Sequence, residues 1–202
     1  MKFRYVTIER EYGSGGTQIG RLLAAKAGIP CYGREILEEV SREYGVPVEK
    51  IERYEETATN SVLYSLYMLS QAAAGNTDML SGEGHIHVAE QAVIRRLAAN
   101  HPAVFLGHCA SEALKEYDGV LRVFIRCTDE EAKKNRMIQE YGIPASQADA
   151  VRRRFDKKRA AYYYANTARK WDDLGTYDVV LDSGRLEERQ CADALGAFLG
   201  EG

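Results

Sequence analysis

The sequence predicts an α/β fold, a five-stranded parallel sheet flanked by helices, and three observations carry this prediction. Short apolar runs alternate with stretches of helical periodicity along the chain. A glycine-rich turn lies between the first expected strand and the first expected helix. The 202 residues are enough for one sizeable core and show no repeat, low-complexity tract or linker. We therefore expect a single domain over residues 1–202.

Each expected strand is a short run rich in apolar, β-branched or aromatic residues, and each expected helix repeats apolar residues every three or four positions. The first strand covers residues 4–10, and the helix after it covers 16–27 and ends at Gly28-Ile29-Pro30. A short strand at 31–32 leads to a helix at 35–44, which Val46-Pro47 ends. Later strands are expected at 103–106, 121–126 and 177–181, and later helices at 87–100, 129–141, 146–167 and 186–199. This alternation is typical of a doubly wound sheet.

The segment from 47 to 100 reads as mostly helical. Residues 61–74 are apolar nearly all round, so a helix there is buried either within the fold or at a subunit contact. The sequence leaves both positions open, and with them a homodimer.

Composition and charge exclude several classes of protein. Hydrophobic residues make up 45% of the chain, too many for a disordered protein. The net charge of −3 gives no case for binding nucleic acid or an anionic membrane. No run of residues has the roughly 18–20 apolar positions that span a bilayer, and no two of the four cysteines have CxxC spacing. We expect a cytoplasmic protein without a zinc knuckle or disulfide framework.

The glycine-rich turn is the most informative stretch of the chain. Its glycines let the backbone adopt positive φ and aim several N–H groups at one anion, and the helix that follows adds its partial positive charge. The candidate phosphate ligands are Arg10, Gly13, Ser14, Gly15, Gly16 and Thr17. Thr17 stands where the hydroxyl of a phosphate loop holds Mg²⁺. We expect ATP and Mg²⁺ at this turn.

The turn departs from the pattern GxxxxGK[ST] at two positions. With Gly15 aligned to the second glycine, Arg10 stands at the first glycine and Gly16 stands at the lysine. The lysine that reaches the β- and γ-phosphates is therefore absent. Glu9 and Glu11 also place negative charge beside the turn, which opposes phosphate unless they hold a metal ion or pair with arginine. An ordinary strand-to-helix turn without a ligand stays open as the alternative.

A second feature is the basic stretch at 131–170, which carries eleven basic and four acidic residues. Arginine grips phosphate oxygens in a bidentate fork, and phosphoryl transfer depends on such cations. Arg152, Asp156 and Arg159 share one face of the expected helix, where Asp156 can hold an arginine in place. A solvated basic helix with internal salt bridges is the alternative. Trp171 and the tyrosines at 162–164 can stack on a base, although ordinary packing explains them as well.

Six segments, in this order, carry a family resemblance. They are REYGSGG at 10–16, VFLGHCA at 104–110, LRVFI at 121–125, FDKKRAAYY at 155–163, ARKWDD at 168–173 and YDVVLDSGRL at 177–186. Together they resemble the cytidylate kinase-like family, a branch of the nucleoside monophosphate kinases, over nearly the whole chain. The resemblance implies a P-loop NTPase-type sheet, a helical acceptor-binding region at about 33–100 and a lid at about 140–170.

The resemblance also implies a reaction, ATP-Mg²⁺ + nucleoside monophosphate → ADP + nucleoside diphosphate, with small nucleotides as the partners. Residues 13–17 would cradle the donor phosphates. Arg153, Asp156 and Arg159 would be the catalytic residues of the lid, and Arg34 and His108 would lie at the acceptor pocket.

One departure from the family concerns the acceptor. The family usually has GRC at 107–109, and cytidylate kinases have GRD, whereas this chain has GHC. His108 therefore replaces an arginine, and histidine is cationic only below about pH 6.5. A cytidylate-like acceptor is the leading hypothesis. A kinase for a different small molecule and a non-catalytic nucleotide-binding regulatory module stay open.

Overall fold

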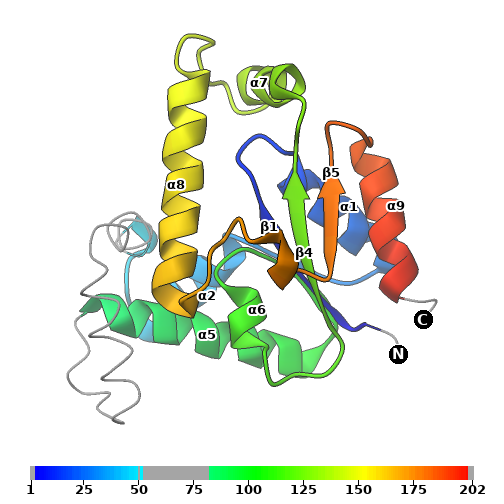
Figure 1. Ribbon diagram of the computed structural model, residues 1–202. Helices are drawn as coiled ribbons and strands as arrows, with labels where there is room; N and C mark the ends of the chain where they lie inside the picture. Colours follow the sequence, from blue (N-terminus) through cyan, green and yellow to red (C-terminus); the bar gives the residue numbers. More distant parts are fainter. Residues whose placement is uncertain (1–2, 50, 52–81, 200–202) are drawn as a thin grey trace.

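The computed structural model describes residues 3–49, 51 and 82–199, and within them one parallel sheet has the strand order β2-β3-β1-β4-β5 (Figure 1). The strands are β1 (Tyr5–Arg10), β2 (Cys31–Tyr32), β3 (Ala103–Leu106), β4 (Val120–Arg126) and β5 (Val179–Asp182). The predicted fold class, a P-loop NTPase-type α/β sheet, is confirmed.

The central strand β1 extends beyond its neighbour β3. Along β3 the pairing ends where Ile8 meets Leu106, whereas along β4 it continues to Arg10 and Ile125. Strands β2 and β3 lie on one side of β1, and strands β4 and β5 lie on the other. The carboxyl end of β1 is therefore a topological switch point of the sheet. Ligands of open parallel sheets bind outside the carboxyl ends of the strands at such a point.

Helices cover both faces of the sheet. One face is covered by α1 (Gly16–Ala27) and α9 (Glu188–Leu199), which pack against each other. The other face is covered by α2 (Glu35–Tyr44), α5 (Gly82–Asn100), the short α6 (Ala110–Ala113) and α8 (Ala148–Thr167). Helix α7 (Glu130–Gln139) lies beyond the carboxyl ends of the strands, and a 3-10 turn, η3 (Leu174–Thr176), precedes β5 (Figure 1).

The expected elements agree with the structure apart from their ends. Helices α1 and α2 have the expected bounds, and α5 begins earlier than expected, at Gly82. Strand β5 begins at Val179 rather than 177, since its pairing with β4 begins where Val179 meets Val123. The turns α6 and η3 were not expected. The helix expected at 61–74 lies outside the described residues.

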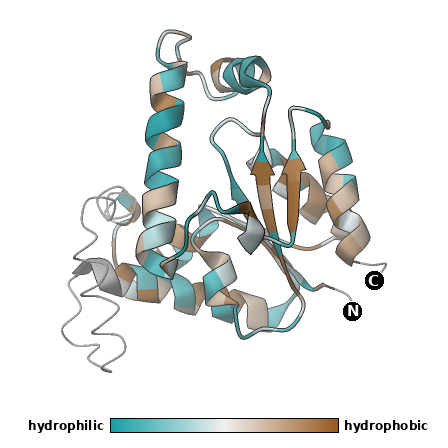
Figure 2. Ribbon diagram, viewed as in Figure 1, coloured by the Kyte–Doolittle hydropathy of each residue, from teal (hydrophilic) through white to brown (hydrophobic). Residues whose placement is uncertain are grey.

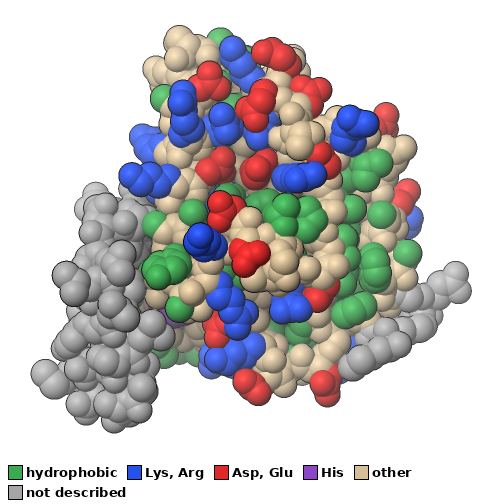
Figure 3. Space-filling view, viewed as in Figure 1, with side chains coloured by type: hydrophobic (Ala, Val, Ile, Leu, Met, Phe, Trp, Pro, Cys, Tyr) green, Lys and Arg blue, Asp and Glu red, His purple; other side chains and the backbone are tan. Residues whose placement is uncertain are grey.

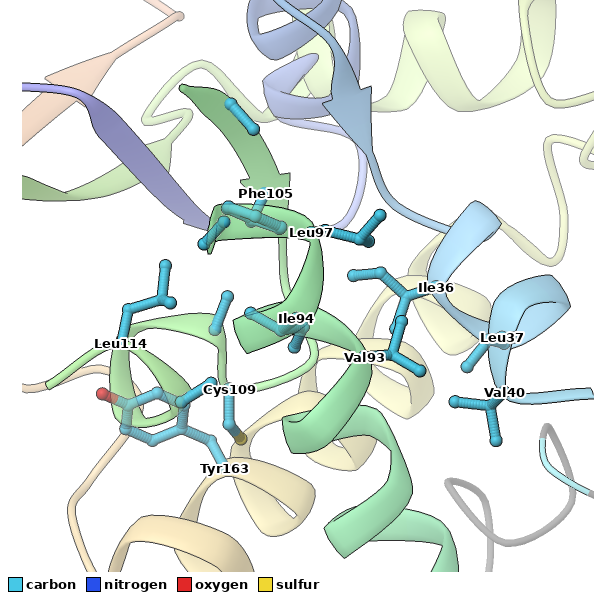
Figure 4. Packing of buried hydrophobic residues seen from close by; sticks show 14 of the residues in the cluster. Ile36, Leu37, Val40, Val93, Ile94, Leu97, Phe105, Cys109, Leu114 and Tyr163 are labelled. Carbon is cyan, nitrogen blue, oxygen red and sulfur yellow. The ribbon is translucent and has the colours of Figure 1, made fainter. Parts of the chain in front are cut away.

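Alternating side chains of the strands build two separate cores. On β1, Val6 and Ile8 point toward α1 and α9, whereas Tyr5 points toward the α5 side. The apolar strands stand out in Figure 2, and Figure 4 shows the α5 side, where Ile94 lies near Phe105. The period of two along a strand causes this division. By the same alternation Glu9 belongs to the α5 face and Arg10 to the α1 face.

No helix among the described residues is long and apolar enough to cross a membrane.

Candidate active site

The glycine-rich turn joins β1 to α1 in a conformation that glycine permits. Gly13 has φ 79° and Gly15 has φ 74°, both in the left-handed region. The Gly16 amide donates to Ser14 Oγ at 3.3 Å, and the buried Ser14 offers its carbonyl to Ser183 Oγ at 2.6 Å. Hydrogen bonds within the turn and from Ser183, the residue after β5, thus hold the turn in place. The turn leads directly into the amides of the first turn of α1, which have no partner within the helix.

Helices α7 and α9 pack closely against the turn and leave no room for a side chain at Gly13 or Gly15. A Cβ on Gly13 would lie 2.9 Å from Lys133 Cγ of α7, and a Cβ on Gly15 would lie 2.3 Å from Glu188 Oε1 of α9. Arg136 of α7 donates to the Gly13 carbonyl at 2.6 Å and pairs with Glu188 at 3.1 Å. The glycines therefore serve close packing as well as positive φ.

A hollow of about 260 Å³ opens beside the turn. It is lined by Arg10, Glu11, Tyr12, Gly13, Gly15, Gly16, Thr17, Tyr141 and Arg159. Among the residues predicted to bind phosphate, only Ser14 is absent from this lining, because its side chain is buried behind the turn. The structure thus brings together the turn, the start of α1 and one arginine of α8.

A second hollow, of about 340 Å³, lies at the switch point. It is lined by Glu9, Arg10, Gly107, His108, Cys109, Phe155, Lys158, Arg159, Tyr162 and Tyr163. Three of these side chains are basic and three are aromatic. Arg10 and Arg159 line both hollows, so two cations stand where the hollows meet.

Arg159 reaches this junction from α8. Its Nη1 donates to the Arg10 carbonyl at 2.8 Å, and its guanidinium lies 5.5 Å from the centre of the Tyr12 ring. Burial, with the neighbouring charge of Arg10, lowers the pKa of Arg159 to about 10, so the side chain remains a cation at neutral pH. Asp156, one helical turn before Arg159, accepts a hydrogen bond from the Tyr12 amide at 2.7 Å, which links α8 to the glycine-rich turn. Burial raises the pKa of this carboxyl.

The two acids beside the turn are both held by other groups. Glu9 is buried on the α5 face and accepts from Trp171 Nε1 at 3.1 Å, and burial raises its pKa. Glu11 accepts from the Cys127 amide at 2.9 Å and pairs with Lys133 Nζ at 3.0 Å. The negative charge that the sequence places beside the turn is therefore partly compensated by neighbours.

His108 lines the second hollow and has an unusual backbone conformation. Gly107, His108 and Cys109 have φ of 75°, 55° and 51°, and left-handed backbone is uncommon for residues other than glycine. The His108 side chain is only 10% exposed, and its Nδ1 lies 3.7 Å from Oε1 of the fully buried Glu90. Glu90 also accepts a hydrogen bond from the hydroxyl of Tyr162.

Two predicted site residues do not line either hollow. Arg34, the residue before α2, is exposed and pairs with Glu38 of that helix at 3.1 Å. Arg153 is exposed, and its Nε donates to the Asp149 carbonyl at 3.3 Å. Figure 3 shows basic side chains gathered over α8, and those on its outer surface include Arg153, Arg154 and Lys157.

Four further residues have roles at the site that the sequence did not predict. Lys133 and Arg136 lie one helical turn apart on α7 and pack against the glycines. Trp171 donates to Glu9, and Glu90 faces His108; Glu9 and His108 both line the second hollow. Lys133 and Arg136 belong to the basic stretch at 131–170, but the sequence does not say which residues of that stretch reach the glycines. Nothing local to Trp171 or Glu90 in sequence indicates their partners, which lie 162 and 72 positions away.

A third hollow, of about 780 Å³, adjoins the other side of the turn. It lies between α1, α7 and the loop from β5 to α9, and its lining is Gln18, Leu22, Arg136, Glu140, Ser183, Gly184, Arg185, Leu186, Glu187, Glu188, Arg189 and Gln190. Arg136 and Glu188 separate this wider hollow from the glycines of the turn.

The residues present suit a magnesium ion that arrives with a nucleotide. Within the described ranges, no three His, Cys, Asp or Glu side chains are grouped so as to hold a metal ion. Thr17 offers a hydroxyl at the hollow beside the turn. Mg²⁺ in such sites takes most of its ligands from phosphate oxygens and water, so one hydroxyl is consistent with that ion.

Comparisons with known proteins agree with this fold. The sequence profile of the cytidylate kinase-like family matches residues 5–185. The structure of an uncharacterized protein from Eubacterium ventriosum ATCC 27560 is similar with a TM-score of 0.71 and 23% identity, over 96% of this chain and 97% of that one. A shikimate kinase from Bacteroides thetaiotaomicron is similar with a TM-score of 0.50 and 14% identity, over 96% and 94%. These likenesses show the fold. No curated protein matches the sequence.

Proposed function

The chain belongs to the cytidylate kinase-like family and is a nucleotide-binding, kinase-like protein, and from this premise we propose that it transfers the γ-phosphoryl group of ATP to a nucleoside monophosphate. The observation that carries the proposal is the position of Arg10 and Arg159, which line both the hollow at the glycine turn and the hollow at the switch point. A phosphoryl group that passes between two hollows is stabilised by cations at their junction.

The donor would lie along the turn. Its phosphates would meet the backbone amides of residues 13–17, and its base would extend into the wider hollow beyond Arg136 and Glu188. Thr17 would hold a Mg²⁺ ion that, when bound, adds positive charge to the phosphates. In the transfer the bond from the γ-phosphorus to the β-phosphate oxygen breaks, a bond to an acceptor oxygen forms, and ADP leaves.

The acceptor would lie in the hollow at the switch point. Three basic side chains favour an anionic acceptor, and the rings of Phe155, Tyr162 and Tyr163 offer surfaces for a base. Arg159 would stabilise the transferring group, and Asp156 would position α8 on the turn. A pyrimidine monophosphate such as CMP is the first candidate, with His108 on the side where the family usually has arginine. Arg34 and Arg153 have no part in this arrangement, since both lie outside the hollows.

A specific observation favours a second candidate, a small molecule with a reacting hydroxyl. His108 Nδ1 faces the buried carboxylate of Glu90 at 3.7 Å. A carboxylate behind an imidazole suits a general base, which a hydroxyl acceptor uses and a phosphate acceptor does not need. The two candidates differ in whether the acceptor oxygen must lose a proton.

The test is ADP release from MgATP with CMP, dCMP, UMP, AMP and GMP offered separately, followed by a panel of phosphate-free polyols. Turnover with a pyrimidine monophosphate supports the leading proposal. Turnover with polyols alone moves the assignment to a hydroxyl acceptor. If MgATP binds and no acceptor is phosphorylated, the protein is a nucleotide-binding module without this activity.

Substitution of Arg159 tests its role. We expect Arg159→Ala to lower kcat by about a hundredfold or more, because one preorganised donor at a transition-state charge contributes that much. Lys157→Ala, on the exposed side of the same helix, is the matched control and should change kcat by less than about twofold. Equal rates for wild type and Arg159→Ala would remove Arg159 from the mechanism.

A further inference from the structure

The two departures of the glycine turn from the common phosphate-loop pattern are neighbours in space. Arg10 replaces the first glycine of the pattern and Gly16 replaces the lysine, six residues later. A Cβ on Gly16 would lie 2.6 Å from Arg10 Cβ and 2.9 Å from Arg10 Cγ. The arginine side chain therefore runs across the space in which a lysine at position 16 would begin.

Steric exclusion accounts for the glycine at 16. Gly13 and Gly15 have positive φ, whereas Gly16 does not, so its backbone would accept any residue. The nearest atoms to its added Cβ all belong to Arg10 and to Ile125, whose Cβ lies at 3.2 Å. Gly16 is needed because Arg10 occupies the adjoining space.

The far end of the arginine lies over a second glycine. A Cβ on Gly107 would lie 2.4 Å from Arg10 Nη1. Gly16 and Gly107, from opposite sides of the switch point, thus form a slot through which the side chain passes. The side chain of Arg10 passes through this slot, and its guanidinium lies where both hollows meet.

Packing against Gly16 and Gly107 positions this guanidinium, and the carboxylate of the adjacent Glu9 acts on it electrostatically. Among the residues that the structure describes, the Arg10 side chain makes no hydrogen bond and no ion pair, and its Nε is buried without a partner. Other cations at the turn are engaged: Lys133 pairs with Glu11 and Glu130, and Arg136 pairs with Glu188. Arg10 as a whole is half-buried and lines both hollows, so an anion in either hollow can reach its guanidinium.

We propose that Arg10 supplies the cation that the lysine supplies in phosphate loops with the GxxxxGK[ST] pattern. The arginine at position 10 and the glycine at position 16 are then two coupled substitutions, since each requires the other. The inference rests on the proposed function only in that the anion is the terminal phosphates of a nucleoside triphosphate. Arg10 donates from the end of β1, across Gly16, to the phosphates that the turn amides hold. Its planar fork also reaches toward the second hollow, where a lysine would present a single point charge.

The exchange can be reversed by substitution. Arg10→Gly together with Gly16→Lys changes residues 10–17 to Gly-Glu-Tyr-Gly-Ser-Gly-Lys-Thr, which matches the full GxxxxGK[ST] pattern. Four proteins are compared: wild type, Arg10→Gly, Gly16→Lys and the double variant. Calorimetry measures the binding of MgATP and of inorganic tripolyphosphate, which separates phosphate contacts from contacts to the base. Thermal unfolding of each protein checks that it folds.

We expect Arg10→Gly to weaken binding of both probes by about 10- to 100-fold, the effect of a hydrogen bond to a charged group. Gly16→Lys should weaken binding or folding on its own, because the new side chain collides with Arg10. The double variant should bind within about fivefold of wild type. Binding by Arg10→Gly that equals wild type, or a double variant no better than Arg10→Gly, would overturn the inference, and so would a wild type that binds neither probe.

A second comparison uses Gly107. Gly107→Ala should weaken tripolyphosphate binding more in the wild-type background, where the new methyl group displaces Arg10, than in the double variant, where Arg10 is gone. Backbone strain at φ 75° affects both backgrounds equally, so the difference between them isolates the slot. Equal effects in the two backgrounds would contradict it. The proposed function can fail separately: rescue of binding in the double variant without phosphorylation of any acceptor would leave the role of Arg10 intact.

Discussion

Glu9 illustrates, at the scale of single residues, how neighbours in space decide the chemistry of a side chain. In sequence it stands beside Arg10 at the mouth of a phosphate-binding turn, where a carboxylate repels the ligand. Strand alternation turns it to the other face of the sheet, where Trp171 donates to it and burial raises its pKa. The sequence shows an acidic residue beside the turn, but it does not show its hydrogen-bond donor, Trp171, which lies 162 residues later.

Trp171 provides a test of this arrangement. We expect Trp171→Phe to lower the free energy of unfolding by about 1–3 kcal/mol, because the buried Glu9 carboxyl loses its donor while the ring packing is largely kept. Urea unfolding followed by circular dichroism measures the change. Tyr164→Phe is the control, since Tyr164 is 45% exposed, and should alter stability by less than about 0.5 kcal/mol. No loss in Trp171→Phe would mean that Glu9 does not depend on the indole.

Since Trp171 is also the single tryptophan of the chain, its fluorescence offers a signal for ligands that enter the hollow beside Glu9.

At the scale of elements, helix α8 explains which of the expected lid residues reach the site. Successive residues of a helix are rotated by about 100°. Asp156, Arg159 and Tyr163 are separated by three and four positions and therefore share the inner face, whereas Arg153, six positions before Arg159, points outward. The periodicity alone separates Arg153 from Arg159, although it does not say which of them faces the turn. The bonds to Tyr12 and Arg10 decide that.

A bidentate ion pair joins β4 to Asp178, the residue immediately before the edge strand β5. Arg122 donates through Nε at 3.0 Å and Nη2 at 2.7 Å to the Asp178 carboxylate, which also accepts from the Arg122 amide at 2.8 Å. These hydrogen bonds hold the pKa of Asp178 below its ordinary value of 3.8. A carboxyl whose pKa is lower in the folded state stabilises the fold above its unfolded pKa and loses this effect as the pH falls through the folded value.

We therefore expect Asp178→Asn to lower the free energy of unfolding by about 1 kcal/mol at pH 7. The difference from wild type should shrink as the pH falls below 3.8, the ordinary value, because the wild-type carboxyl then becomes neutral as well. Denaturant unfolding at several pH values measures this. Asp193→Asn removes a surface pair with Lys26, whose two side chains are 62% and 59% exposed, and should have little effect. A pH-independent difference would attribute the loss to packing instead of charge.

At the scale of the whole molecule, the candidate site is made by segments that are far apart in sequence. The turn at 10–17, the β3 end at 107–109 and helix α8 meet only because parallel strands place their carboxyl ends at one edge of the sheet. Gly142, with φ 66° and nothing near it, precedes Pro144 at the approach to α8. We propose that the segment at about 140–170 closes over the bound nucleotide, since a kinase must exclude water from the transferring group.

Hydrogen exchange tests the closure. At MgATP concentrations near a hundred times Kd, we expect amides of the turn and of residues 142–160 to exchange up to about a hundredfold more slowly, because binding stabilises the closed state by about 2.7 kcal/mol. Helix α2, which lines neither nucleotide hollow, serves as the internal reference. Protection of the turn without protection of residues 142–160 would mean that this segment does not close on the donor.

The sequence by itself determined the order of the elements, the parallel α/β fold, the position of the turn and the family, since each depends on local periodicity, local turn chemistry or a run of adjacent residues. The tertiary structure alone decided that Arg159 and not Arg153 lies in the hollows, that Arg34 lies outside them, that Trp171 donates to Glu9, and that Arg10 passes between Gly16 and Gly107. These facts depend on contacts between residues far apart in the chain, and the energy of such contacts becomes defined only when the sheet brings the strand ends together.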